Sequence, residues 1–236
     1  MGQSYFIFAG KDCRQMGCRL KSPLPIIRPE ERADHTQIPG RAGDLTVLEG
    51  TDVFNSYIHT ASISVDGWQN VRRVYDWLRG SGYLTTSSEP DRRQQARVIG
   101  AITLDKVSKN LDIWTGECQF YCQPLKELIF PAAVSAAPNG AVINMGDVTA
   151  KPIWTVTPSG TTVKLKAGGK ELTVTGCTSG TQIIINSDVM EVTNLAGSVS
   201  LTKNASGEFP VLLPGNNTLT GSGWSAVSIQ KNERYL

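Results

Sequence analysis

Hydrophobic and polar residues alternate along several short runs in the first 130 residues, which is the pattern of half-buried β-strands. The clearest run is LDIWTGECQFYC, residues 111–122, in which Cys118, Phe120 and Cys122 fall on one side and are expected in the core. The same criteria predict further strands at 5–8, 45–49, 57–65 and 97–105. Residues 22–39 are charged, marked by prolines and poorly periodic, so a loop or an extended arm is expected there.

One stretch has helical periodicity instead. In DGWQNVRRVYDWLRG, residues 66–80, four apolar side chains recur at helical spacing and form one stripe, namely Val71, Val74, Tyr75 and Leu78. Asp66 is expected to cap the N-terminus of this helix in a capping box with Gln69, and Gly80 is expected to end it.

Charged side chains occupy the other side of the predicted helix. Arg72 and Arg73 point away from the apolar stripe together with Asp76 and Arg79, so this cluster is either a solvated face or a contact with a partner. The run SSEPDRRQQ, residues 87–95, predicts an exposed hairpin tip or loop.

The second part of the chain has no helical stripe, and turn signals such as AGGK, NASG and PGNN recur at short intervals. Strands are expected at 152–157, 161–166, 170–175, 181–186, 189–193, 198–202, 208–213 and 224–230. This spacing is typical of a β-sandwich. The uncharged segment PAAVSAAPNGA, residues 131–141, predicts a linker, which gives a first domain at 1–130 and a second at 142–236.

Composition narrows the class of protein. The chain has 236 residues, 40% hydrophobic and 19% charged, as in ordinary soluble proteins with a real core. A net charge of +2 gives no reason to expect a nucleic-acid binder or a membrane-surface protein. The opening MGQSYFIFAGKD lacks a basic start, and no apolar run approaches the length of a membrane helix, so neither a signal peptide nor membrane insertion is expected.

Candidate chemistry is sparse. The five cysteines are odd in number and lack metal-site spacing, so free thiols in a reducing cytoplasm are expected and a zinc site is not. His59 lies in a predicted strand and is expected to be structural, whereas His35 is expected in an exposed loop. With no hydrolase, nucleotide-binding or metalloprotease motif, the sequence favours a non-enzyme without cofactor or metal.

Aromatic residues of the second domain leave an alternative function open. Trp154, Trp224 and Tyr235 are candidates for stacking on sugars, as in carbohydrate-binding sandwiches that attach to a cell surface. Trp154 stands in the middle of a predicted strand, however, where a tryptophan usually belongs to the core.

The stretch IPGRAGDLTVLEG, residues 38–50, concentrates unusual features before a predicted strand. Gly40 and Gly43 permit positive φ, so the chain can turn sharply there. Arg41 and Asp44 are then held on a tight turn, where they serve either the turn itself or contacts with another subunit.

Several short segments, taken in their order and spacing, carry a resemblance to a known family. In the first domain they are YFIFAG at 5–10, PGRAGDL at 39–45, WLRG at 77–80 with the strand of Leu84 after it, ARV at 96–98 and ECQFYCQP at 117–124. In the second domain they are NMG at 144–146, KPI at 151–153, IIIN at 183–186 and GEFPVLLPGNN at 207–217. Together they resemble the distal tail protein (Dit) family of long-tailed siphophages. The family usually has an acidic residue in place of Ala42 and often Asp in place of Asn186.

The resemblance implies a mainly β protein, in which the N-terminal domain with one α-helix forms a homohexameric ring and the C-terminal domain is a galectin-like β-sandwich. The ring, single or stacked on a second ring, would join the tail tube to the tail-tip or baseplate hub protein at the distal end of the virion tail. Phage DNA would pass through its lumen without specific binding, and the near balance of 16 basic and 15 acidic residues in the first domain agrees with this.

Within such a ring, the interface candidates are Arg41, Asp44, Arg72 and Arg73. In some relatives the C-terminal domain docks receptor-binding proteins or carries sugar-binding insertions, but this chain has no large insertion. The particle would be assembled in the host bacterial cytoplasm. The remaining alternative, a tail-associated hydrolase, needs a carboxylate or zinc site that the sequence does not supply.

Overall fold

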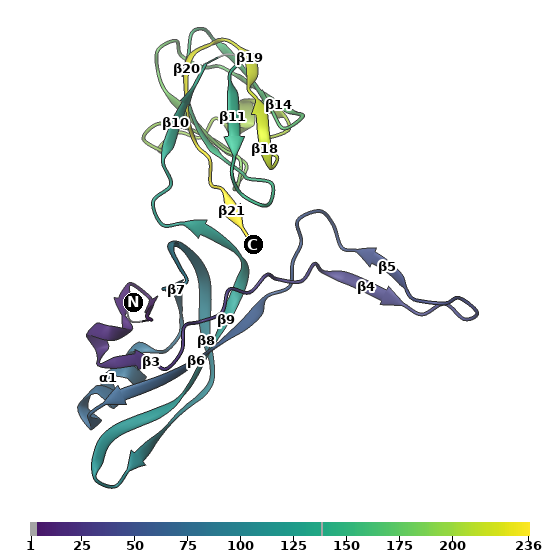
Figure 1. Ribbon diagram of the computed structural model, residues 1–236. Coiled ribbons are helices and arrows are strands. Elements are labelled where there is room, and N and C mark those ends of the chain that lie inside the picture. The colour runs from purple at the N-terminus through teal and green to yellow at the C-terminus, as the bar shows by residue number, and fades with distance from the viewer. Residues whose placement is uncertain (1–3, 138) are drawn as a thin grey trace. The chain divides into compact units, whose positions relative to one another are not determined.

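The computed structural model describes residues 4–137 and 139–236, which are mainly β, as the sequence predicts (Figure 1). The chain divides into two compact units: unit 1 extends to Ile129 and includes Leu236, and unit 2 comprises Phe130–Tyr235. No helix among the described residues is long and apolar enough to span a membrane.

Unit 1 is built on an antiparallel sheet with the strand order β2-β1-β7-β8-β9-β6-β3. Its strands are β1 (Phe6–Phe8), β2 (Lys11–Asp12), β3 (Cys18–Leu20), β6 (Tyr57–Asp66), β7 (Ser81–Thr86), β8 (Glu89–Ser108) and β9 (Leu111–Leu128). The strong alternation of buried and exposed positions in β6 and at 117–122 of β9 shows that one face of this sheet meets the core. The expected inward side of Cys118, Phe120 and Cys122 is confirmed.

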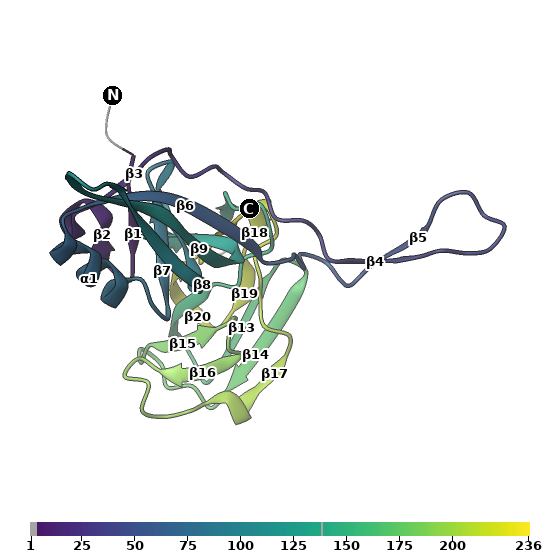
Figure 2. The ribbon, with the colours of Figure 1, turned by 90° about the horizontal axis from the view of Figure 1, so that it is seen from below.

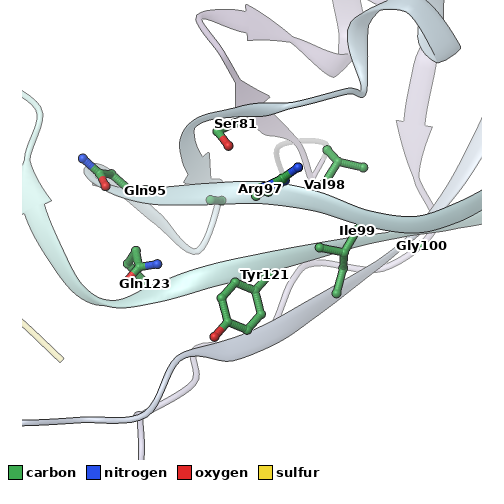
Figure 3. Close-up of a pocket in the computed structure, with 9 residues that line it drawn as sticks. Ser81, Gln95, Arg97, Val98, Ile99, Gly100, Tyr121 and Gln123 are labelled. Carbon is green, nitrogen blue, oxygen red and sulfur yellow. The ribbon is translucent and has the colours of Figure 1, made fainter.

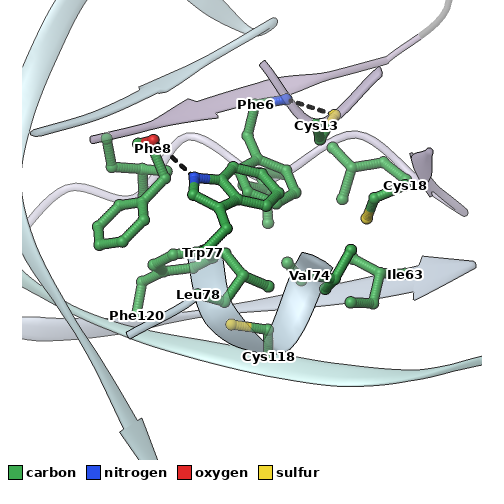
Figure 4. Close-up of a cluster of buried hydrophobic side chains, with 14 of the residues drawn as sticks. Phe6, Phe8, Cys13, Cys18, Ile63, Val74, Trp77, Leu78, Cys118 and Phe120 are labelled. Atoms are coloured by element: carbon green, nitrogen blue, oxygen red, sulfur yellow. Dashed lines mark hydrogen bonds between the residues drawn. The ribbon is translucent and has the colours of Figure 1, made fainter. Parts of the chain in front are cut away.

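Helix α1 (Trp68–Trp77) and the 3₁₀ helix η1 (Cys13–Met16) contribute to the core of unit 1 (Figure 4). The Trp77 ring stacks on Phe6 at 5.4 Å between centroids, and its Nε1 donates a 2.9 Å hydrogen bond to the carbonyl oxygen of Phe8. Phe120 meets Phe6 edge-on from the sheet. Helix and sheet are therefore joined by aromatic packing and by a satisfied indole N–H, both of which stabilise a buried tryptophan.

The helix differs from its prediction at three points, the first being that it ends at Trp77 with Leu78 as the C-cap, two residues before Gly80. Trp77 takes the core position expected for Tyr75, which is 39% exposed. Asp66 is not the cap: the carboxylate of Asp112, on β9, accepts the hydrogen bond from the backbone N–H of Trp68, and Asp66 forms an ion pair with Arg19. Gly67 occupies the N-cap position with φ 84°, which explains why a glycine follows Asp66.

The hairpin of β8 and β9 is longer than predicted. The register of its ladder shifts three times, once between Ile99 and Thr103, and Gly100 in this irregular stretch has φ 70°. Residues 89–95, expected as a hairpin tip or loop, instead form the start of β8 because they pair with β7 and β9.

Unit 2 is a β-sandwich whose core draws side chains from both main sheets. One sheet has the order β10-β20-β12-β15-β16 and the other β17-β14-β13-β19, while β11 pairs with β18. The first sheet contains β10 (Ala133–Ala136), β12 (Ile153–Pro158), β15 (Ile183–Asn186), β16 (Glu191–Asn194) and β20 (Trp224–Gln230). The remaining elements are β11 (Ala141–Asn144), β13 (Thr162–Ala167), β14 (Lys170–Thr175), η2 (Thr202–Asn204), β17 (Ala205–Gly207), β18 (Gly215–Thr218), β19 (Thr220–Ser222) and β21 (Arg234–Tyr235).

Three segments of unit 2 differ from their sequence-based predictions. Part of the segment expected as a linker forms β10, which pairs with β20. Residues 198–202 contribute a single bridge, between Ser200 and Thr193 of β16, and the Thr202 hydroxyl accepts the hydrogen bond from the N–H of Val192. Residues 208–213 contribute a single bridge, between Leu212 and Ala150, instead of a ladder.

Candidate assembly interface

A hairpin arm projects from the sheet of unit 1 (Figures 1 and 2). It comprises residues 30–55 and contains β4 (Ala33–Thr36) and β5 (Leu45–Leu48), which pair only with each other. Backbone hydrogen bonds continue the ladder toward the base, from the N–H of Arg32 to Val53 and from the N–H of Asn55 to Glu30. The sequence predicts a loop or arm for the first half of this segment, and the structure resolves it as one continuous hairpin.

Apolar side chains of the arm are exposed to solvent. Leu45 is 40% exposed, Val47 53% and Leu48 55%. The register places Leu45 and Val47 on one face with Asp34 and Thr36, whereas Leu48 lies on the opposite face with His35. An isolated two-stranded hairpin is at best marginally stable in water, so an arm with this composition is typical of a segment that becomes ordered against a partner.

The backbone conformation at the tip of the arm explains why two glycines stand beside Arg41 and Asp44. Gly40 has φ 81° and Gly43 has φ 80°, which is the left-handed backbone that reverses the chain between the two strands. Arg41 and Asp44 are both exposed, and in the described part of the chain no ion pair joins them. They are therefore presented to solvent at the far end of the arm.

A basic hollow lies between α1 and the η1 segment. It is open, has a volume of about 590 Å³, and is lined by Lys11, Met16, Arg73, Asp76 and Arg79 among others. Arg73 donates a hydrogen bond to the side chain of Asn70. Among the described residues, none of the three cations of the hollow forms an ion pair. Arg72 is exposed on the same helix. The hollow consequently carries an uncompensated positive charge.

A second open concavity, of about 740 Å³, lies on the sheet of unit 1 (Figure 3). Its lining includes Ser81, Gln95 and Gln123, with Arg97 as the single charged side chain and Tyr121 42% exposed. Hydroxyl and amide groups alternate with apolar side chains such as Val98 and Ile99, and no carboxylate or histidine lines it. The concavity contains neither an acid–base pair nor a nucleophile. Its polar side chains are suited to weak polar contacts.

The buried charges of unit 1 lie elsewhere, around His59. Its side chain is 3% exposed, and burial is the main cause that lowers its pKa to about 4, with the nearby Lys126 cation acting in the same direction. Lys126 forms a 2.7 Å ion pair with Glu89, which also pairs with Arg92. His59 is thus a buried neutral side chain, as the sequence predicts for a structural histidine. His35 lies on the arm, 3.1 Å from the Thr46 hydroxyl.

The three sugar-stacking candidates are buried, and Trp154 and Trp224 belong to the core of unit 2. Trp154 is fully buried, and Trp224 and Tyr235 are each 7% exposed. Trp154 donates its indole N–H to the Ser187 hydroxyl and Trp224 to the carbonyl oxygen of Lys164. Their ring faces are covered by protein, so they offer no platform for a sugar. Within the described residues, no group of three or more His, Cys, Asp or Glu side chains is arranged to hold a metal ion.

The four ring-interface candidates therefore fall into two places. Arg41 and Asp44 lie at the tip of the arm, and Arg72 and Arg73 lie on α1. The sequence did not indicate that Lys11 lines the basic hollow or that one face of the arm carries exposed apolar side chains. Strand alternation in LTVL was a usable signal for that face, whereas nothing local indicates that Lys11 lies beside Arg73.

Comparisons with known proteins bear on the fold. No protein-family model matches the chain, and no curated protein matches it. Among solved structures it is similar to the crystal structure of the Dit (gp 19.1) protein of phage SPP1, described as a paradigm of the hub adsorption apparatus in phages that infect Gram-positive bacteria. The match covers 100% of both chains with a TM-score of 0.80 at 17% sequence identity. Over its whole length, this chain has the Dit fold.

Proposed function

We propose that this chain is a structural protein of a phage tail, which forms a hexameric ring at the distal end of the tail tube. The observation that carries the proposal is the full-length match to a phage Dit structure, which includes both units of the chain. In this role unit 1 builds the ring, and unit 2 offers a surface for tail-tip proteins or receptor-binding proteins.

The physical character of unit 1 supports a ring. It has an exposed arm with apolar side chains and, on α1, a basic hollow, two surfaces that a monomer leaves uncovered. Two different surfaces that fit each other produce a head-to-tail contact, and such contacts close into a ring when the rotation between neighbours divides a full turn. The near balance of acidic and basic residues in the first 130 positions suits a lumen that lets DNA pass without holding it.

The proposed partners follow from this position. One face of the ring meets the tail-tube protein, and the other meets the tail-tip or baseplate hub protein. The protein is then a virion component of the distal tail.

The test is the mass of the purified chain in solution by light scattering, followed by negative-stain imaging. A ring has six times the 25.5 kDa mass of one chain, or twelve times if two rings stack, and shows a central hole. A chain that stays monomeric up to high micromolar concentration, alone and mixed with its tail-tube and hub proteins, contradicts the proposal.

A further inference from the structure

We infer that a small polar cavity in unit 1 binds one buried water molecule, which is hydrogen bonded to Nδ1 of His59. The cavity draws its lining from β6, β7, β8 and β9, and the polar side chains in this lining include His59, Thr86, Glu89, Gln94 and Lys126. It has room for one water-sized sphere, about 10 Å³. This is about the volume that a single water molecule needs in a protein interior.

The buried nitrogen of His59 is the first argument. The His59 side chain is 3% exposed and lines the cavity, and its Nδ1 forms no hydrogen bond with any residue that the structure describes. Polar groups in a protein interior are nearly always hydrogen bonded, because a buried group that loses water without gaining a partner costs free energy. Where the protein itself supplies no partner, an ordered water in an adjoining polar space is the usual one.

Further polar partners around the cavity are the second argument, because a buried water typically forms about three hydrogen bonds. Lys126 is 3% exposed, and its ammonium group donates to Glu89 and to the carbonyl oxygen of Leu236. Gln94 is also 3% exposed, and its amide nitrogen donates to the Cys122 sulfur. An ammonium group has three hydrogens and an amide group two, so each side chain has one more to donate to a water.

The charges of the lining favour water over a small anion. Glu89 accepts a 2.7 Å ion pair from Lys126 and a 3.2 Å ion pair from Arg92. Arg93 pairs with Glu127 at 2.9 Å. Each cation that lines the cavity therefore already has a carboxylate partner, and burial of a further anion without a counterion would cost free energy.

The protonation state of His59 also favours water. Burial lowers the pKa of His59 to about 4, so the imidazole is neutral at pH 7. A neutral imidazole carries a proton on one nitrogen only, so Nδ1 is either a donor or an acceptor. Water satisfies Nδ1 in both cases, whereas a halide ion satisfies it only when Nδ1 is the donor.

A crystal structure of the purified chain, at a resolution that shows ordered waters, tests the site directly. We expect a single peak of electron density roughly 2.7–3.2 Å from Nδ1 of His59, within hydrogen-bond range of at least one further polar atom of the lining. Crystals soaked in bromide are expected to show no anomalous peak there. A bromide peak at this position overturns the inference, and so does an Nδ1 with no density peak beside it.

Proton relaxation dispersion of the solvent tests the site in solution, because it counts the water molecules that stay bound for longer than the protein tumbles. His59→Phe removes Nδ1, and its larger apolar ring extends into the cavity, so we expect one long-lived water fewer than in wild type. His59→Asn keeps a polar atom in the side chain and is expected to keep the water. The matched control His35→Gln replaces an exposed histidine and is expected to keep it as well.

Equal counts of long-lived waters in wild type and folded His59→Phe would overturn the inference, as would loss of one in the His35→Gln control. The crystallographic test uses wild type, so it decides the question even if His59→Phe does not fold. The cavity lies within unit 1 of a single chain, so both measurements are independent of ring formation.

Discussion

Replacing His59 by phenylalanine is expected to remove a defined part of the pH dependence of stability. The imidazole is buried in β6, and its Nδ1 has no hydrogen-bond partner among the residues that the structure describes. Its ring packs edge-on against Tyr57, with 5.2 Å between the ring centroids. Protonation would place a cation in this site beside Lys126. Burial therefore lowers the pKa of His59 from about 6.5 in the unfolded chain to about 4 in the folded protein.

The sign and size of the effect follow by linkage. Between pH 6.5 and 4 the unfolded chain binds the His59 proton and the folded protein does not, so the free energy of unfolding falls as the pH falls through this window. Each unit of pKa difference corresponds to about 1.4 kcal/mol, so a shift from 6.5 to about 4 corresponds to roughly 3 kcal/mol in total. Below pH 4 both states are protonated, and His59 contributes no further loss.

The assay is urea unfolding at several pH values between 7 and 4, for wild type, His59→Phe and the control His35→Gln. Phenylalanine keeps a flat aromatic ring, is larger by about one to two methylene groups and removes an unpartnered nitrogen, so stability at pH 7 is expected to stay within about 1.5 kcal/mol of wild type. The control loses an exposed histidine and should keep the wild-type slope. Carboxylates contribute equally to all three proteins, so their effect cancels in the differences. An unchanged slope in His59→Phe would refute the reasoning.

Three further predictions concern packing. Trp77→Phe removes the hydrogen bond to Phe8 and part of the stacked ring, so it should lower the free energy of unfolding by about 2–3 kcal/mol in urea titrations; a loss below about 0.5 kcal/mol would contradict this account. Gly116→Ala places a Cβ against the carbonyl oxygen of Thr103, closer than real Cβ atoms approach, so it should lower the free energy of unfolding by about 2–3 kcal/mol. The control Gly160→Ala meets open space and should change the free energy of unfolding by under about 0.5 kcal/mol. The five cysteines are buried free thiols, and burial raises their pKa values. A thiol reagent should therefore label the native protein far more slowly than the urea-unfolded chain, in which all five thiols should react. Rapid labelling of the native protein would contradict their burial.

Local patterning predicted much of unit 1 from the sequence. Alternation around Phe120 indicated a strand with one buried face, and helical spacing of Val71 and Val74 indicated α1. These features are readable because burial on one side of a regular element repeats every two or every 3.6 residues. Helical spacing predicted Tyr75 in the core, but Trp77 is the buried residue. Both lie near the edge of the apolar stripe, and the stacking of Trp77 on Phe6 decides between them.

Such local patterns do not predict contacts between residues that are distant in the sequence. The helix cap is supplied by Asp112, 44 residues after Trp68, because the sheet brings the β8–β9 hairpin beside α1. The interior position of Trp154 depends on Ser187 accepting its indole N–H. Aromatic side chains are equally suited to a core and to a binding surface, so composition does not show whether a tryptophan in a strand faces the core.

The sequence by itself determined a mainly β chain with one helix, its core-facing runs in unit 1, and the sharp turn at Gly40 and Gly43, because each depends on neighbouring residues. Only the tertiary structure decided that this turn is the tip of a projecting arm, and that the arm and the basic hollow lie at opposite ends of unit 1. The physical reason is that periodicity records which side of an element is buried, whereas strand order and register decide what that side meets.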